Sequence, residues 1–386
     1  MWHDIQFDSS IENKVNQICV SNNMNVSDVF KIFMTKTAMT GVLSEKVIKS
    51  IDRIKTQDKV TRNELIEKCL QIILDNDKTL DSEKLKAKVL SDLEIIEQSK
   101  DIHIAAGEYF EMGLYDKSVE QIKEEYLSDN DTKWIYDHFN KPDKNVDTSN
   151  KYTCYKLLQQ YYHRQVYELP DDIKAAKKMC EDKLADLGFY ILKAKHGSLG
   201  DGVKIIRSKS DIDSYFSDYP YLGSIIEEYV KQSDDIGILN SSSLNTIRFT
   251  IINTGTKKYI HSYFRIGRAG LEVDNVAKGG IICELDQDTG KIIRCVDKFG
   301  HRFDRHPDSG LPLVGFFIPD YNKAKQLACD ISDKMQSTHK YIGVDLAKTD
   351  DGWVLIEFNN KTGIVSVQTA FNRGLKKDIK AIISKM

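Results

Sequence analysis

GVDLAKTDDGWVLIEFNN, residues 343–360, is the stretch of this sequence that decides the fold. Two runs rich in apolar and β-branched residues flank an Asp-Asp-Gly sequence at 350–352, which is typical of the turn of a β-hairpin. Residues two apart on a strand face the same side, so Glu357 and Asn359 should point together. Asp345 should reach toward them from the neighbouring strand. The sequence therefore predicts a hairpin on which three side-chain oxygens converge.

This converging set of oxygens is suited to a magnesium ion. Mg²⁺ prefers carboxylate and amide oxygens, together with the phosphate oxygens of a nucleotide, in near-octahedral geometry. Asp345, Glu357 and Asn359 supply two carboxylates and one amide. The alternative that the sequence leaves open is a hairpin with one polar face and no ion.

A glycine-rich loop occurs earlier, in KAKHGSLGDGV at residues 193–203, directly after an apolar strand at residues 189–192. Glycines let backbone N–H groups approach phosphate oxygens, and a lysine at the end of the strand adds a positive charge beside them. The loop is not a Walker loop, because no Gly-Lys-Ser/Thr sequence ends it. A plain hairpin is the alternative. The candidate phosphate-binding residues are Lys193, Gly197, Ser198, Gly200 and Gly202.

A third candidate segment is IIEEYV at residues 225–230, an apolar run that ends in two acids and an aromatic residue. Such a segment can form a hinge for adenine, since backbone N–H and C=O groups can pair with the edge of the base. Gln232 or Asp234 would then hold the ribose hydroxyls. Alternatively, the segment is only the end of a strand. The residues assigned to the hinge are Glu227, Glu228, Tyr229 and Val230.

Length and composition limit the classes of protein that need to be considered. At 386 residues the chain is long enough for two or three domains, and its formal net charge is -3. The near-balance of acids and bases argues against a protein that coats nucleic acid, so we expect a small-molecule partner and no DNA. The longest apolar runs fall short of the about 18 residues that a membrane span needs. Seven cysteines form no Cys-x-x-Cys pair, which favours reduced thiols and a cytoplasmic protein.

The chain changes character along its length. Residues 10–145 have apolar positions at helical spacing, with Pro142 as the one breaker. From about residue 189 onward, β-branched and aromatic runs alternate with glycine, aspartate and asparagine, which predicts a sheet with helices. The sequence thus predicts an α+β protein with a mainly helical N-terminal region.

The order and spacing of the three segments described above resemble the ATP-grasp superfamily. The residues between them resemble one branch, the sugar-transfer-associated ATP-grasp domain of polysaccharide biosynthesis proteins, over residues 150–370. The resemblance implies an ATP-grasp fold, in which two α+β subdomains clasp the nucleotide. The pieces that carry it are NKY at 150–152, YHR at 162–164, NTIR at 245–248, FRIG at 264–267, VDN at 273–275, KGG at 278–280, DTG at 288–290 and HP at 306–307.

The resemblance also implies which residues contact ATP. Lys151 and Lys193 would touch its phosphates, residues 197–202 would close over them as a lid, and the hinge residues would flank the adenine. His196 and Asp201 depart from the family pattern, because they make the loop bulkier and more acidic than the usual small-residue loop.

The resemblance further implies which residues bind the metal and which contact the transferred phosphoryl group. The hairpin acids and amide match the superfamily's metal-binding triad, Asp345, Glu357 and Asn359. Three cations would lie near the transferred phosphoryl group, where negative charge develops. These cations are Arg248, Arg265 and Lys278. NKT at residues 360–362 departs from the proline-containing turn that commonly follows the metal strand.

The N-terminus carries a separate resemblance. Residues 4–42 resemble the ribbon-helix-helix fold of antitoxins, in which a strand pairs with that of a second copy and its basic side chains read the major groove. Asp4 and Asp8 occupy this strand instead. Phosphates would repel these acids, so a homodimer is expected rather than DNA binding. An ordinary helical extension is the alternative.

These patterns predict three segments: a ribbon-helix-helix unit or helical extension over residues 1–45, a helical region over 46–149, and an ATP-grasp domain over 150–386. The implied function is that of an ADP-forming ligase, which uses Mg-ATP to join a carboxylate to an amine through an acyl-phosphate. Its substrate would be a sugar acid or amino acid of surface polysaccharide biosynthesis. A small-molecule kinase and a nucleotide-binding regulator with a DNA-binding N-terminus are the alternatives.

Overall fold

The computed structural model describes residues 61–197, 202–219, 223–270, 274 and 279–385. The chain divides into two units, Met1–Glu64 and Leu65–Met386. The predictions for residues 1–45 therefore lie outside the described residues, and the account below concerns the second unit. Among the described residues, no helix is both long and apolar enough to cross a membrane.

The first part of this unit is helical, as predicted. Side-chain caps start several of its helices: Asp81 accepts a hydrogen bond from the Lys84 backbone N–H, and Ser118 and Ser128 each form a capping box. The helices bury one apolar cluster, which includes Val89, Leu93 and Phe110. The elements are α4 (Arg62–Asn76), α5 (Ser82–Gln98), α6 (Ala106–Glu111), η1 (Leu114–Asp116), α7 (Val119–Glu125) and α8 (Asp129–Phe139).

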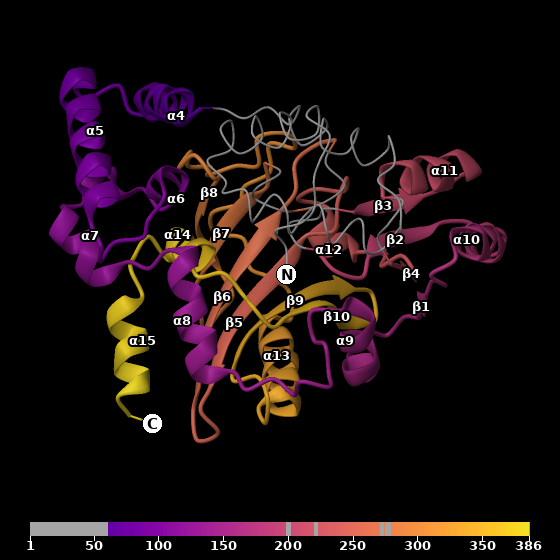
Figure 1. Cartoon of the computed structure of the whole chain (residues 1–386). Helices are drawn as coiled ribbons and strands as arrows, with labels where there is room; N and C mark the ends of the chain where they lie inside the picture. Colours follow the sequence, from indigo (N-terminus) through magenta and orange to yellow (C-terminus); the bar gives the residue numbers. More distant parts are fainter. Residues whose placement is uncertain (1–60, 198–201, 220–222, 271–273, 275–278, 386) are drawn as a thin grey trace, which may run out of the picture. The chain divides into compact units, whose positions relative to one another are not determined.

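A small antiparallel sheet follows, with strand order β1-β4-β2-β3. Helices α10 and α11 lie beside this sheet (Figure 1) and pack on it. The core between them contains Tyr190, Leu192 and Tyr215. The elements are α9 (Lys151–Leu158), η2 (Gln159–Tyr161), β1 (Val166–Glu168), α10 (Ile173–Leu187), β2 (Tyr190–Ala194), β3 (Val203–Ile206), α11 (Lys209–Asp218) and β4 (Ser224–Glu227).

A larger antiparallel sheet forms the rest of the unit, with strand order β10-β9-β5-β6-β7-β8. Its four longest strands, β10, β9, β5 and β6, are neighbours in this order (Figure 1). The elements are α12 (Asp234–Gly237), β5 (Thr246–Asn253), β6 (Lys258–Ile266), β7 (Ile281–Leu285), β8 (Ile292–Val296), α13 (Tyr321–Met335), β9 (Tyr341–Thr349), β10 (Gly352–Asn359), α14 (Val365–Phe371) and α15 (Lys376–Ile383).

The two faces of the larger sheet pack against different helices, because side chains alternate along a strand. On β5, Ile247, Phe249 and Ile251 join the apolar cluster that holds α13. Ile252 and Tyr263 belong instead to the cluster that includes α14, α15 and part of α8. The α+β class predicted from the sequence is confirmed, and the polar residues described below share the second face.

Gln368 of α14 connects the helical region to the C-terminal helices. Its Oε1 accepts hydrogen bonds from the backbone N–H groups of Leu127 at 3.0 Å and Leu375 at 3.1 Å, and its Nε2 donates to the Leu127 carbonyl at 2.6 Å. The side chain is fully buried. Buried backbone groups that lose such partners are costly, because no water replaces them.

We therefore expect Gln368→Met, which keeps the length of the side chain, to lower the free energy of unfolding by about 3 kcal/mol, since three backbone groups lose their partners. Urea unfolding followed by circular dichroism measures this change. Gln326→Met, at an exposed position of α13, is the matched control. A loss no larger than that of the control would contradict the prediction.

Candidate functional site

A cavity of about 760 Å³ lies where the two sheets and the helical region meet. Its volume is typical of small-molecule sites, which measure about 300–1,000 Å³. The smaller sheet contributes Lys193 and Glu227 to its wall. The larger sheet contributes five of the residues singled out from the sequence, which are Arg248, Arg265, Asp345, Glu357 and Asn359.

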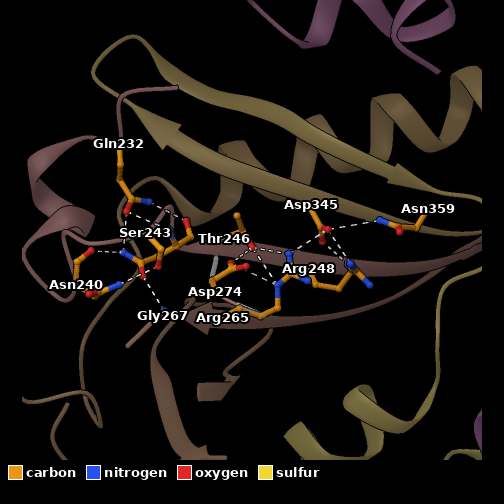
Figure 2. Close-up of polar contacts among 11 residues, drawn as sticks. Gln232, Asn240, Ser243, Thr246, Arg248, Arg265, Gly267, Asp274, Asp345 and Asn359 are labelled. Atoms are coloured by element: carbon orange, nitrogen blue, oxygen red, sulfur yellow. Dashed lines mark hydrogen bonds and ion pairs between the residues drawn. The ribbon is translucent and has the colours of Figure 1, made fainter. Parts of the chain in front are cut away.

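Asp345 is the centre of the charged wall (Figure 2). Strand register brings Arg248 of β5 directly opposite Asp345 of β9. Arg248 Nη2 donates to Asp345 Oδ2 at 2.7 Å, Arg248 Nε binds the other oxygen, and Arg265 Nη2 lies 3.0 Å from Oδ2. The Asp345 side chain is only 2% exposed. Burial alone would raise the pKa of Asp345, but the two guanidinium charges outweigh burial and lower it, so the carboxylate stays ionised.

Arg265 is held from its other side by a pair that the sequence reasoning did not assign. Arg265 Nη2 donates to Thr246 Oγ1 at 2.7 Å, and Thr246 in turn donates to Asp274. Asp274 Oδ2 also lies 3.6 Å from Arg265 Nε. Asp274 occurs in the VDN piece quoted above, but no spacing rule indicated that its carboxylate would face this arginine.

The three predicted metal ligands gather at the same strands. Glu357 lies opposite Asp345 in the β9–β10 register, and Asn359 Nδ2 is 3.5 Å from Asp345 Oδ2. A β-bulge between Leu355 and Glu357 interrupts the alternation, so that the adjacent residues Ile356 and Glu357 both line the cavity. The bulge lies before Glu357, and Glu357 and Asn359, which were predicted to point together, both line the cavity.

This donor set fits Mg²⁺ by its chemistry. Two carboxylates and one amide offer hard oxygen ligands, although Asn359 here turns its amide nitrogen toward Asp345, and a metal would need the opposite amide orientation. A bound cation would also have to replace arginine contacts on Asp345. In the part of the chain that the structure describes, no group of three His, Cys, Asp or Glu side chains is placed to hold a metal.

A second ion cluster lies on the smaller sheet. Glu227 is buried and pairs with both Lys193 and Arg164. Arg164 also donates to the backbone carbonyl of Leu355 at 2.6 Å, which connects the two sheets. Burial alone would raise the pKa of Glu227, but the charges of Arg164 and Lys193 lower it to about 2. Arg164 was noted in the sequence only as part of the YHR piece.

Lys151 lies beside this cluster but does not line the large cavity. Its Nζ is 3.2 Å from Glu357 Oε1 and donates to the Gly197 carbonyl at 2.8 Å. Lys151 and Lys193 both line a smaller cavity of about 20 Å³, together with Glu227 and Glu357. The two lysines expected to act together are thus neighbours.

The residues of the predicted adenine hinge line the cavity, whereas the two candidate ribose partners are not placed to bind a ribose. Glu228, Tyr229 and Val230 line the cavity, as Glu227 does. Asp234 is exposed at the start of α12 and is absent from the lining. The amide of Gln232 is occupied by the backbone of Asn245, at 2.7 Å and 3.1 Å. Neither proposed ribose partner is therefore placed for that contact.

The glycine-rich loop is described only at its ends. Gly197 accepts the hydrogen bond from Lys151, and Gly202 has a φ of +67°, a conformation that favours glycine. Neither glycine belongs to the lining of the large cavity. Ser198, Gly200 and Lys278 lie outside the described residues, so their predicted roles stay predictions.

Two antiparallel sheets enclose a cavity with these cations and acids, which is the arrangement that the sequence resemblance implies. Residues 217–384, less than half of the chain, match the model of the sugar-transfer associated ATP-grasp family. The resemblance stated from the sequence is thus confirmed for this part of the chain.

No curated protein matches the chain. Among solved structures, D-alanyl-alanine synthetase A from Vibrio cholerae is 14% identical, with a TM-score of 0.37, 56% of this chain covered and 56% of that chain covered. D-alanine–D-alanine ligase from Helicobacter pylori is 11% identical, with a TM-score of 0.39 and coverages of 60% and 63%. N5-carboxyaminoimidazole ribonucleotide synthetase from Thermotoga maritima is 11% identical, with a TM-score of 0.35 and coverages of 61% and 49%. The chain thus spans about half to under two thirds of these proteins.

The phosphate contact expected of Lys193 can be tested by Lys193→Met. Loss of one charge-assisted contact should weaken binding of Mg-ATP by about tenfold or more, as measured by isothermal titration calorimetry. Arg164 still pairs with Glu227 in the variant, so the fold should be kept. Lys204→Met, on the neighbouring strand and outside the cavity lining, is the control. Equal affinities for all three proteins would remove Lys193 from the site.

The metal role expected of Glu357 can be tested by Glu357→Gln. ADP release should fall by on the order of a hundredfold or more, the scale observed when one electrostatic group is removed from a catalytic site. The magnesium concentration needed for half-maximal ATP binding should rise as well. Asp350→Asn, at the exposed turn of the same hairpin, is the control. Unchanged magnesium dependence in Glu357→Gln would exclude the metal assignment.

Proposed function

We propose that this chain is an ATP-dependent ligase that joins a carboxylate to an amine and forms ADP and phosphate. The observation that carries the proposal is the pair of guanidinium groups, Arg248 and Arg265, held against Asp345 beside Glu357 and Asn359 in one cavity. The family match of residues 217–384 supports ATP as the nucleotide.

In this proposal the nucleotide lies along the cavity from the smaller sheet toward the larger one. Glu228, Tyr229 and Val230 flank the adenine, because they line the cavity just beyond the end of β4. Lys193 contacts the phosphates from the cavity wall, and Lys151, beside the cavity next to Glu357, would have to turn toward them to do the same. An incoming phosphate would take Glu227's place as a partner of Lys193, while Arg164 keeps the Glu227 carboxylate paired.

Asp345, Glu357 and Asn359 would hold Mg²⁺ in this proposal. When bound, the ion would neutralise charge on the β- and γ-phosphates. The other contacts with the transferred phosphoryl group would come from arginines of the chain. Arg248 and Arg265 lie where they can donate hydrogen bonds to the transferred phosphoryl group and to the acyl-phosphate, and fixed donors are most effective where charge develops.

The proposed reaction has two steps. An oxygen of the substrate carboxylate attacks the γ-phosphorus of ATP, and the bond between that phosphorus and the β–γ bridging oxygen breaks, so ADP leaves and an acyl-phosphate forms. The free amine then attacks the acyl carbon, phosphate leaves with the electron pair of the C–O bond, and the nitrogen loses a proton. Neither step needs a covalent intermediate with the protein.

A sugar acid or an amino acid is the proposed carboxylate. The family description, sugar-transfer associated, favours a role in surface polysaccharide biosynthesis. A cytoplasmic location and a homodimer remain predictions of the sequence.

The reaction itself gives a direct test. With Mg-ATP, a panel of sugar acids and amino acids, and hydroxylamine, the protein should release ADP and form a hydroxamate, because hydroxylamine traps an acyl-phosphate. AMP and pyrophosphate should not form, since the charged groups are proposed to surround the β/γ end of the nucleotide. Chromatography of the nucleotides and colorimetry of the hydroxamate measure both products.

Reactions that lack the carboxylate, or that contain an alcohol in its place, are the controls. Release of ADP with an alcohol, and no hydroxamate with any carboxylate, would show a kinase instead of a ligase. Formation of AMP would contradict the proposed chemistry altogether.

A further inference from the structure

The large cavity extends beyond the residues assigned to ATP and magnesium. Its wall also includes residues of the helical region and of the segment that follows β10. None of these was singled out as a site from the sequence. They are Glu111, Asp129, Thr132, Tyr136, Lys361, Gly363 and Ser366.

A chain of contacts joins this part of the cavity to the phosphoryl-transfer region. Arg248, which pairs with Asp345, also donates through Nη1 to Thr362 Oγ1 at 3.3 Å. The next residue, Gly363, lies against Asp129, because a Cβ added to the glycine would stand 2.9 Å from Asp129 Oδ1. A substrate bound in this part of the cavity would therefore lie beside the arginines, on the opposite side from the nucleotide.

Asp129, which lines the cavity, and Glu108, which does not, both face backbone N–H groups. Burial has the largest effect on the pKa of Asp129 and raises it, whereas the backbone N–H groups of Val365 and Ile364, which the carboxylate faces, lower it. Glu108, nearby on α6, binds the backbone N–H groups of Ala105 and Asp129. Both of these carboxylates therefore have structural partners.

Glu111, in contrast, lines the cavity without a hydrogen-bond or ion-pair partner among the described residues. It is the last residue of α6, and its neighbours Phe110 and Met112 are buried in the core, which fixes its direction. Burial raises its pKa to about 7, and the negative charges of Asp129 and Glu108 add to this effect, while Lys298 opposes it. An incoming cation would offset the cost of ionising this carboxyl group.

We propose that Glu111 binds the ammonium group of the amine substrate, at the end of the cavity formed by α6, α8 and residues 361–366. This inference rests on the proposed ligase function and names the chemical class of its second substrate, a primary amine that enters as the ammonium ion. The ammonium passes one proton to the Glu111 carboxylate, which leaves the free amine that attacks the acyl carbon. Of the acids in this wall, Glu111 is the one whose carboxylate is available to accept N–H hydrogen bonds. Tyr136 and Ser366, which also line the cavity, carry hydroxyl groups that suit a polar substrate.

A comparison of two nucleophiles of similar size distinguishes an effect on binding of the cation from an effect on the rate of the reaction. Methylamine is protonated at neutral pH, whereas hydroxylamine is uncharged, and both attack acyl-phosphates. In Glu111→Gln, the KM for methylamine should rise by about tenfold to a hundredfold, which corresponds to loss of one charge-assisted hydrogen bond. The rate of hydroxamate formation should stay within about twofold of wild type. Glu120→Gln, at an exposed position of α7, should match wild type in both reactions.

A binding measurement keeps the inference testable if no carboxylate substrate is found. Methylammonium chloride should raise the melting temperature of the full chain above that in equal sodium chloride, for wild type and Glu120→Gln but not for Glu111→Gln. Absence of ADP and hydroxamate from wild type, with this binding retained, would refute the ligase and leave the amine site standing. An unchanged KM for methylamine, or equal stabilisation of wild type and Glu111→Gln, would overturn the amine site.

Discussion

The structure of the site depends on one buried carboxylate shared by two buried arginines. Asp345 lies on β9, in the middle of the larger sheet, where an ionised group without partners would be severely destabilising. Arg248 and Arg265 satisfy it, and Thr246 with Asp274 hold the second arginine in turn. This pairing is what allows a polar wall to exist on a sheet whose other face is a continuous apolar core.

The alternation of strand residues extends this constraint to the whole domain. Ile247 and Phe249 must face α13, so Arg248 between them must face the other side, which α14 and α8 partly cover. Apolar helices cannot cover a face that carries arginines, because the arginine charges would then be buried without partners. The helical region therefore meets this face with polar groups such as Asp129, and a cavity remains between them.

The sequence predicted those parts of the site that depend on local pattern. The hairpin at residues 343–360, the acids on its strands and the cations of β5 and β6 could all be read from alternation, turn chemistry and family resemblance. Contacts that depend on packing between distant segments could not. Arg164 reaches the Leu355 carbonyl across 191 positions, and the bulge beside Glu357 changes which side chains face the cavity. Asp234 failed to reach the cavity for a similar reason, because the chain turns into α12 after β4.

Both ion clusters have the same design, and this design explains how the site remains stable without a ligand. Each places one acid between two cations: Glu227 between Arg164 and Lys193, and Asp345 between Arg248 and Arg265. An anionic ligand can take over one cation while the other keeps the acid paired, so no buried charge is left alone at any stage. Replacing either acid by a neutral residue would leave two like charges facing each other. The acids are therefore needed to assemble the cations, even where only the cations would contact a phosphate.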